Sequence, residues 1–242
     1  MEKTLLALDT STLSLSLAVV RIDGGGGARV LAERFSAPGP NHSKLLPLLV
    51  DEALSEAGVT LAELSGIAVG IGPGAFTGLR IALSTAKGIA WAARLPLAGA
   101  SGLEAMALRA ARASPDAGSI VPLLDARKQE VYAGFYAPSG QGVSQLSPEV
   151  VAPPAEVAAK LASLPRPLLL LGEGYFAYRT LFDEATEGFR RDGVAELPES
   201  PMAAEIAELA APGMLPFDKQ AVFSLEPRYL RQSEAELKLK GK

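Results

Sequence analysis

Residues 4–22, TLLALDTSTLSLSLAVVRI, predict two β-strands joined by a tight turn, and this pair of strands decides the fold. Both arms are apolar, and Asp9 closes the first of them. The same arrangement returns in residues 119–136, SIVPLLDARKQEVYAGFY, where Asp125 closes the first arm. A unit of strand, turn and strand that recurs at a long interval indicates a duplicated architecture.

Each of these hairpins begins the same succession of expected elements. In the first half a third strand at 28–35 is followed by a helix at 42–58, a buried strand at 64–72 and a helix at about 77–93. The order strand, strand, strand, helix, strand, helix recurs in the second half, so we predict an α/β duplication with a mixed sheet in each half. Further strands are expected at 96–100, 143–151, 167–175 and 193–197, and further helices at 101–113, 153–164, 178–189 and 200–210.

The boundary between the halves is expected between the strand at 96–100 and the restart of the pattern. We assign residues 1–104 to an N-terminal lobe, which carries the helices at 42–58 and 77–93. Residues 105–242 form the C-terminal lobe, and their last segment, about 212–242, is expected to pack back on the first lobe.

The composition provides few of the residue types that usually catalyse reactions or bind metals. There is no cysteine and one histidine, His42, which excludes disulfides, thiolate zinc sites and a cysteine nucleophile, and we expect no metal site. Because His42 opens a predicted helix, it is most simply a packing or capping residue, with Ser43 as the expected N-cap. The net charge of −4 argues against direct binding of nucleic acid. We expect no signal peptide, no membrane-spanning helix and a cytoplasmic location.

A glycine-rich loop at residues 70–78, GIGPGAFTG, precedes the helix at 77–93 and resembles a phosphate-binding turn. A dinucleotide-binding fingerprint requires a third glycine where Thr77 stands, and a Walker A loop requires Lys where Leu79 follows Gly78. The loop therefore fails both nucleotide motifs. What remains is a helix N-terminus with Thr77 as an expected cap.

The helix after this loop carries small residues at regular spacing. Rows of small side chains allow another element to approach a helix closely, and two rows on different faces predict a second helix on the outer side. On the helix at 42–58, Leu45 and Leu48 fall outside the apolar arc, beside Glu52, and mark a partner surface. We predict that the first row binds the partner together with Leu45, Leu48 and Glu52. The first row is Gly78, Ala82, Ala86 and Ala90, and the second is Ser84, Gly88 and Ala92.

The two aspartates occupy the positions where actin-like ATPases hold phosphate and metal in hairpin turns. Such turns need glycine, because backbone N–H groups must approach the phosphate oxygens. Here Ser11 stands at the expected glycine of the first turn, and Ala126 with Arg127 at that of the second, so the turns are filled. An ordinary role as turn residues explains both aspartates equally well. In the same architecture Gly172 and Gly174 would lie near an adenine, or they form a plain strand-to-helix turn.

Six motifs in order along the chain resemble the bacterial TsaB (YeaZ) family. The motif GPGAFTGLR with a following AKG is the most specific of them. The motifs are LALDTSTLSLSLAVV (6–20), NHSKLLPLL (41–49), GIGPGAFTGLRIALSTAKGIA (70–90), LLDARKQEVYAGFY (123–136), GEGY (172–175) and PRYLR (227–231).

The resemblance implies a two-lobed actin-like/Hsp70-like (ASKHA) duplication. It also implies a non-catalytic scaffold role in making threonylcarbamoyladenosine (t6A) in tRNA. The family's partners are TsaD, which carries the metal and transfers the threonylcarbamoyl group, and the ATPase TsaE. Pairing with TsaD, or with a second copy, is expected through the helices at 42–58 and 77–93. No cofactor is expected in this chain, ATP and metal belong to the partner subunits, and tRNA is contacted only indirectly.

Two other functions stay open from the residues. The first is a degenerate ATPase or kinase of the ASKHA fold that uses Asp9 and Asp125 with magnesium. The second is a peptidase, which a single histidine and the lack of cysteine make the weakest of the three.

Overall fold

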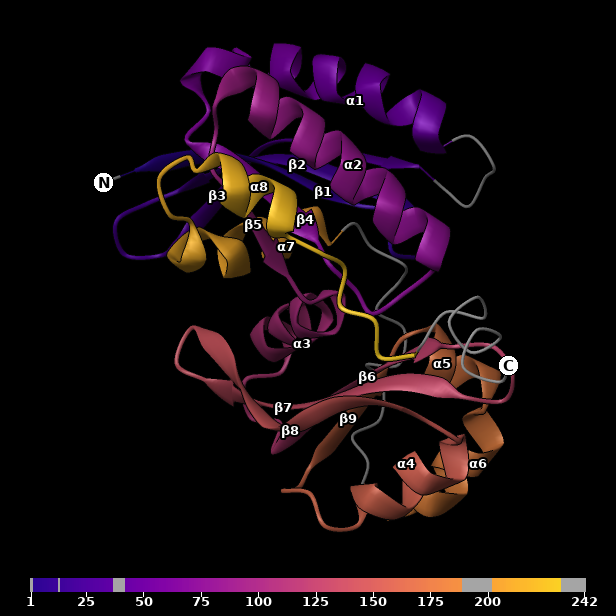
Figure 1. Ribbon diagram of the computed structural model, residues 1–242. Coiled ribbons are helices and arrows are strands. Elements are labelled where there is room, and N and C mark those ends of the chain that lie inside the picture. The colour runs from indigo at the N-terminus through magenta and orange to yellow at the C-terminus, as the bar shows by residue number, and fades with distance from the viewer. Residues whose placement is uncertain (1, 13, 37–41, 189–201, 232–242) are drawn as a thin grey trace, which may run out of the picture. The chain divides into compact units, whose positions relative to one another are not determined.

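The computed structural model describes residues 2–12, 14–36, 42–188 and 202–231 (Figure 1). The chain divides into two compact units. The first comprises Met1–Ala105 and Ser200–Arg228, and the second comprises Met106–Glu199 and Tyr229–Lys242. Within the described ranges, every helix is too short or too polar to cross a membrane.

The first unit is built on a mixed sheet of five strands in the order β3-β2-β1-β4-β5. The first three strands form an antiparallel meander, and β4 and β5 join β1 in parallel. Both connections into parallel strands pass through a helix, as parallel pairing requires. The strands are β1 (Lys3–Asp9), β2 (Leu15–Ile22), β3 (Ala28–Ser36), β4 (Gly66–Gly70) and β5 (Leu97–Ala100).

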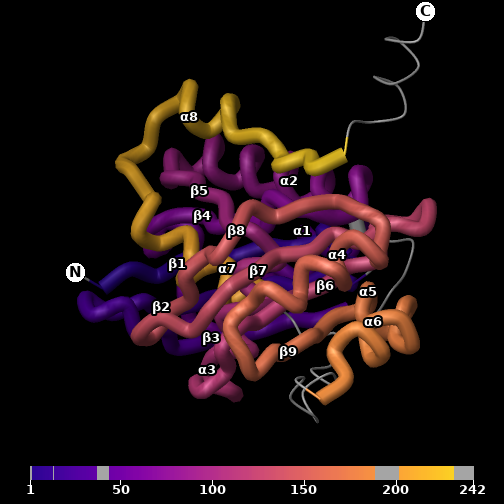
Figure 2. Tube along the Cα trace, turned by 90° about the horizontal axis from the view of Figure 1, so that it is seen from below, coloured from indigo at the N-terminus to yellow at the C-terminus, as the bar shows by residue number. Residues whose placement is uncertain are grey.

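Helices cover both faces of this sheet. Side chains alternate along β1, so that Leu6 and Leu8 join the core under α1 (His42–Ala57) and α2 (Phe76–Ala93). Their neighbours Leu5 and Ala7 point to the other face, where α7 (Ala203–Ala210) packs on β1, β2 and β4. The short α8 (Lys219–Ser224) lies beside α2 (Figure 2). The 3₁₀ turns η1 (Leu61–Glu63) and η2 (Ala211–Gly213) complete this unit, and α3 (Gly102–Ala113) begins in it and ends in the second.

The second unit repeats the same plan with four strands in the order β8-β7-β6-β9. β6, β7 and β8 form an antiparallel meander, and β9 joins β6 in parallel. Each strand corresponds to one of β1–β4 in order, pairing and direction, which confirms the predicted duplication. The elements are β6 (Ser119–Asp125), β7 (Val131–Ser139), β8 (Gly142–Ala152), α4 (Pro154–Leu161), β9 (Leu168–Leu171), α5 (Glu173–Ala177) and α6 (Arg179–Ala185).

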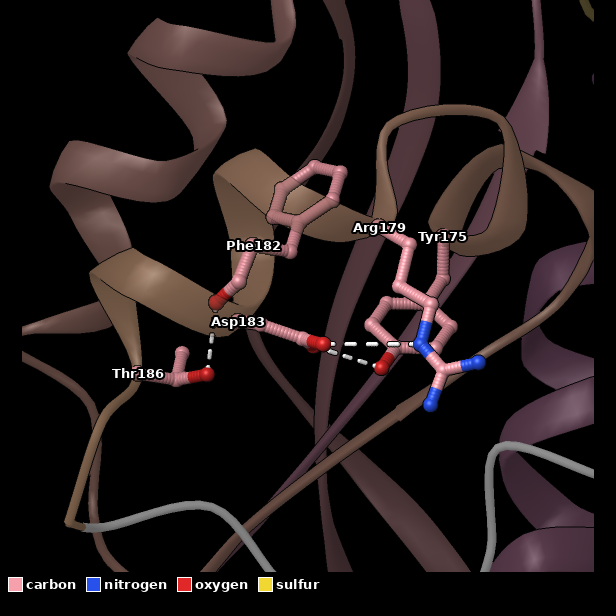
Figure 3. A network of polar contacts seen from close by, with 5 residues as sticks. All are labelled: Tyr175, Arg179, Phe182, Asp183 and Thr186. Carbon is pink, nitrogen blue, oxygen red and sulfur yellow. Dashed lines mark hydrogen bonds and ion pairs between the residues drawn. The ribbon is translucent and has the colours of Figure 1, made fainter.

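A polar network holds α5 and α6 together in the second unit (Figure 3). The buried Tyr175 donates a hydrogen bond from its hydroxyl to Oδ1 of Asp183 at 2.6 Å. Nε of Arg179, also on α6, lies 3.4 Å from Oδ2 of the same carboxylate. After α6 the hydroxyl of the C-cap residue, Thr186, donates a hydrogen bond to the Phe182 carbonyl oxygen at 2.6 Å. The cap side chain therefore satisfies a carbonyl group in the last turn of the helix.

Several local expectations differ from the structure. The helix expected at 200–210 in the C-terminal lobe is α7, which belongs to the first unit because its apolar residues complete the second face of the first sheet. The helix expected at 178–189 is the shorter α6, and α5 precedes it. The strand expected at 193–197 lies outside the described residues.

Two predicted helix caps are wrong. α1 begins at His42, so Ser43 lies inside the helix rather than at its N-cap. α2 begins at Phe76 after Ala75, so Thr77 lies in its first turn, and no side chain caps this end. Each helix therefore begins two residues earlier than its predicted cap implied.

Candidate functional site

The carboxylate of Asp9 is engaged by its own turn. Oδ1 accepts a hydrogen bond from the backbone N–H of Ser11 at 3.0 Å, and Oδ2 accepts one from the Ser11 hydroxyl at 3.1 Å. Only 5% of Asp9 is exposed, and this burial raises the pKa of its carboxyl above the ordinary 3.8, against the opposing effect of the Ser11 hydrogen bonds. Ser11 therefore takes the place that a glycine cradle would leave open for a ligand.

The glycine-rich loop packs directly on this first turn. A Cβ atom on Gly78 would collide with the carbonyl oxygen of Thr10, and one on Gly74 would collide with that of Ser11. Hydrogen bonds also join the loop to the turn. The Thr10 hydroxyl donates one to the Gly78 carbonyl oxygen at 2.6 Å. The Ala75 N–H donates to the Ser11 carbonyl oxygen, also at 2.6 Å. The glycines thus let the start of α2 approach the turn between β1 and β2.

The second turn, between β6 and β7, is closed by arginines. Oδ1 of Asp125 accepts a hydrogen bond from the Arg127 N–H at 2.8 Å, and the Arg127 guanidinium lies 3.0 Å from Oδ2. Arg231 donates to the carbonyl oxygen of Ala126 at 2.7 Å and pairs with Glu130. In both turns the aspartate carboxylate accepts a hydrogen bond from the backbone N–H two residues further along the chain.

Gly172 and Gly174 form a tight strand-to-helix turn. Gly172 has a φ of 96°, and a Cβ atom there would lie 2.7 Å from the terminal methyl of Met106 and would collide with the Leu123 carbonyl oxygen. A Cβ atom on Gly174 would lie 2.8 Å from the carbonyl carbon of Leu124. Both glycines therefore serve the packing of α5 on β6, which favours the plain turn over an adenine site.

A metal site is not evident in the part of the chain that the structure describes. There, no group of three or more His, Asp or Glu side chains lies close enough together to hold a metal ion. His42 is the first residue of α1.

The small-residue row of α2 faces the core of its own unit, which corrects our prediction that it binds a partner. A helix that lies tight on a sheet needs the same four-residue spacing as one that packs on another helix. The outer row of Ser84, Gly88 and Ala92 is exposed. Gly78, Ala82, Ala86 and Ala90 are all buried, the three alanines with no exposed surface.

The predicted residues of α1 are accessible to different degrees. Leu48 is 59% exposed, whereas Leu45 is half-buried. The Glu52 carboxylate lies 3.5 Å from the guanidinium of Arg34 on β3, which also pairs with Glu56 at 2.5 Å. Leu48 is thus the predicted residue that a partner could reach most directly.

An outward stripe along α2 escaped the sequence analysis. Five residues, Phe76, Arg80, Ser84, Lys87 and Trp91, fall within about 80° of one another around the helix. Phe76 is 38% exposed and Trp91 40%, and the Arg80 guanidinium lies 3.7 Å from the centre of the Phe76 ring. The spacing of four and three residues between these side chains is the signal that could have revealed the stripe.

Comparison with known proteins places these features in a family. The family model for TsaD, tRNA N6-adenosine threonylcarbamoyltransferase, matches residues 36–239. The tRNA threonylcarbamoyladenosine biosynthesis protein TsaB of Bacillus subtilis is 33% identical over 239 residues, covering 97% of each chain. The TsaB protein of Escherichia coli is 34% identical over 247 residues, covering 98% of this chain and 99% of its own.

A solved structure extends the likeness to the fold. YeaZ from Pseudomonas aeruginosa superimposes with a TM-score of 0.73 at 31% identity, covering 94% of this chain and 100% of that one. Together with the repeated sheet order, this match confirms the expected actin-like/Hsp70-like (ASKHA) duplication. The chain therefore belongs to the TsaB (YeaZ) family, whose curated members are named as proteins of tRNA threonylcarbamoyladenosine biosynthesis.

Proposed function

We propose that this protein is a non-catalytic scaffold subunit of the t6A machinery that pairs with TsaD and works with TsaE. The observation that carries the proposal is the state of the two turns. Asp9 is engaged by Ser11 and Asp125 by Arg127, so the positions that would serve nucleotide chemistry in this fold are filled by the chain itself. In this proposal the subunit has no catalytic site of its own and contributes by binding TsaD.

The surface proposed for TsaD is the outer side of α1 and α2. Leu48 on α1 and the outward stripe of α2 supply exposed apolar and aromatic groups on two helices that pack against each other. A stable complex of this kind buries about 1,200–2,000 Å² in total. A second copy of the chain could use the same surface in the absence of TsaD.

Cofactors and nucleic acid belong to the partners in this proposal. ATP and metal are expected on TsaE and TsaD. Because the net charge is −4, tRNA is expected to reach this subunit only through the complex. A cytoplasmic location remains part of the proposal.

The test is reconstitution with TsaD and TsaE from the same organism, followed by measurement of t6A formation with and without this chain. We expect modification to depend on the chain and to be lost in the Leu48→Glu variant together with TsaD binding. The matched control is Ala159→Glu, which introduces the same charged side chain at an exposed residue of α4 in the second unit. Full modification without the chain, or normal TsaD binding by Leu48→Glu, would contradict the proposal.

A further inference from the structure

An aromatic patch lies where α8 packs on the C-terminal half of α2. We define it by Trp91 on α2, Phe217 and Phe223 around α8, and the two lysines Lys87 and Lys219. The Trp91 ring centre is 5.0 Å from that of Phe223 and 6.4 Å from that of Phe217. Trp91 is 40% exposed and Phe223 54%, so two adjoining aromatic rings present much of their surface to solvent. Adjoining exposed rings are a stronger signal of binding than a single exposed apolar residue.

The two lysines of the aromatic patch are fixed in place beside the rings. The Lys219 ammonium lies 4.7 Å from the centre of the Trp91 ring. The Lys87 ammonium donates a hydrogen bond to the Phe223 carbonyl oxygen at 2.8 Å. A lysine that is already ordered loses less side-chain entropy when it meets a carboxylate. Aromatic side chains are enriched at protein interfaces, and tryptophan is among the residues that dominate their binding energy.

The aromatic patch continues the surface proposed for TsaD. Trp91 and Lys87 belong to the same outward stripe of α2 as Phe76 and Arg80. α8 therefore adds Phe223 and Lys219 to the end of a surface that begins at the N-terminus of α2. Figures 1 and 2 both show α8 beside α2 in the first unit.

We propose that the TsaD-binding surface extends along α2 onto α8, and that TsaD covers Trp91 and Phe223 with an apolar side chain flanked by carboxylates. The inference rests on the proposed function. The two exposed rings favour an apolar side chain on TsaD, and the ammonium groups of Lys87 and Lys219 favour carboxylates beside it. The segment after α7 thus has a binding role of its own.

The first test measures TsaD affinity for variants of the full-length chain. Lys219→Glu reverses a charge on an exposed side chain, and we expect it to weaken TsaD binding at least about tenfold. Phe223→Ser removes an exposed ring, with a similar expected loss. The matched control is Arg29→Glu, which makes the same charge change on an exposed residue of β3, and we expect it to bind normally. Wild-type affinity in both α8 variants would overturn the inference.

The second test uses Trp91 as a reporter, because it is the only tryptophan in the chain. Fluorotryptophan incorporated into this protein gives one fluorine resonance, whose shift between H₂O and D₂O reports solvent exposure. We expect this solvent shift to fall when unlabelled TsaD is added. An unchanged solvent shift in the complex would overturn the assignment to TsaD.

Leu48→Glu separates the two proposals. If this variant fails to bind TsaD while Lys219→Glu and Phe223→Ser bind normally, the proposed function stands and the extension onto α8 is wrong. If Leu48→Glu also binds normally, the proposed function itself is contradicted.

Discussion

The hydroxyl oxygen of Ser16, on β2, accepts a hydrogen bond from the backbone N–H of Ala203, the first residue of α7, at 2.9 Å. The two residues are 187 positions apart. The preceding residue, Met202, provides no side-chain cap, so the sheet itself satisfies an N–H group that the helix leaves unpaired. This bond joins the late segment of the chain to the first sheet.

We expect Ser16→Ala to lower the free energy of unfolding by about 1–2 kcal/mol, because a buried N–H loses its acceptor. Urea unfolding measures the change. The control is Ser55→Ala on the exposed side of α1, which should change the stability by less than about 0.5 kcal/mol. Equal effects of the two substitutions would show that the Ser16 bond contributes nothing.

Gly78 and Gly88 form a matched pair on α2. Gly78→Ala should destabilise the protein by about 1–3 kcal/mol or more, because its Cβ atom would collide with the Thr10 carbonyl oxygen. Nothing lies within 4 Å of a Cβ atom on Gly88, so Gly88→Ala should stabilise the helix by about 0.5–1 kcal/mol. Thermal unfolding of the two variants checks the opposite signs, and a neutral Gly78→Ala would contradict the close packing on the first turn.

Ala86 and Leu48 should respond differently to charged substitutions. Ala86→Arg places a large charged side chain in a fully buried position, and we expect the folded state to be lost. Leu48→Glu changes a residue that is 59% exposed, so its stability should stay within about 0.5 kcal/mol of the wild type. Circular dichroism and gel filtration distinguish the outcomes, and a well-folded Ala86→Arg variant would show that the small-residue row is not part of the core.

Asp9 should make stability depend on pH in an unusual direction for a carboxylate. Its pKa is raised by burial in the folded state, so the folded protein binds more protons than the unfolded chain above pH 3.8. The free energy of unfolding that Asp9 contributes is therefore highest below pH 3.8 and falls as the pH rises towards the folded pKa. The Asp9→Asn variant should gain stability relative to the wild type over this interval. A stability difference that does not change with pH would contradict the raised pKa.

Nucleotide binding provides the test between a scaffold and a degenerate ATPase. We expect isothermal titration of the isolated chain with ATP and magnesium to give no binding heat, because Ser11 and Arg127 engage the two aspartates. Tight binding that disappears in Asp9→Ala would favour the ATPase instead. The matching control is Asp23→Ala, an aspartate whose carboxylate bonds the exposed loop at Gly25 and Gly27.

Much of the fold could be predicted because the strands carry clear apolar runs. Asp9 and Asp125 mark equivalent strand ends, and the structure pairs those strands as expected. The position of α7 could not be predicted, since its apolar residues fit either sheet and only the tertiary structure assigns them to Leu5 and Ala7.

The candidate site was predicted less well for a similar reason. Spacing showed that Ala82 and Ala86 share a helix face but could not say whether that face meets a sheet or a partner. Trp91 was missed because its significance depends on Phe223, which lies far away in the sequence. The close approach of Gly78 to the Thr10 carbonyl oxygen likewise appears only when the turn and the helix are seen together.

The return of α7 to the first sheet has a consequence for synthesis on the ribosome. The first unit begins to emerge before the second, yet it cannot be completed until α7, which follows the sequence of the second unit, has left the exit tunnel. Until then the face that carries Leu5 and Ala7 has no cover from α7. Nascent chains that stall before Ala203 would expose this apolar face, which makes them targets for chaperones and prone to aggregate.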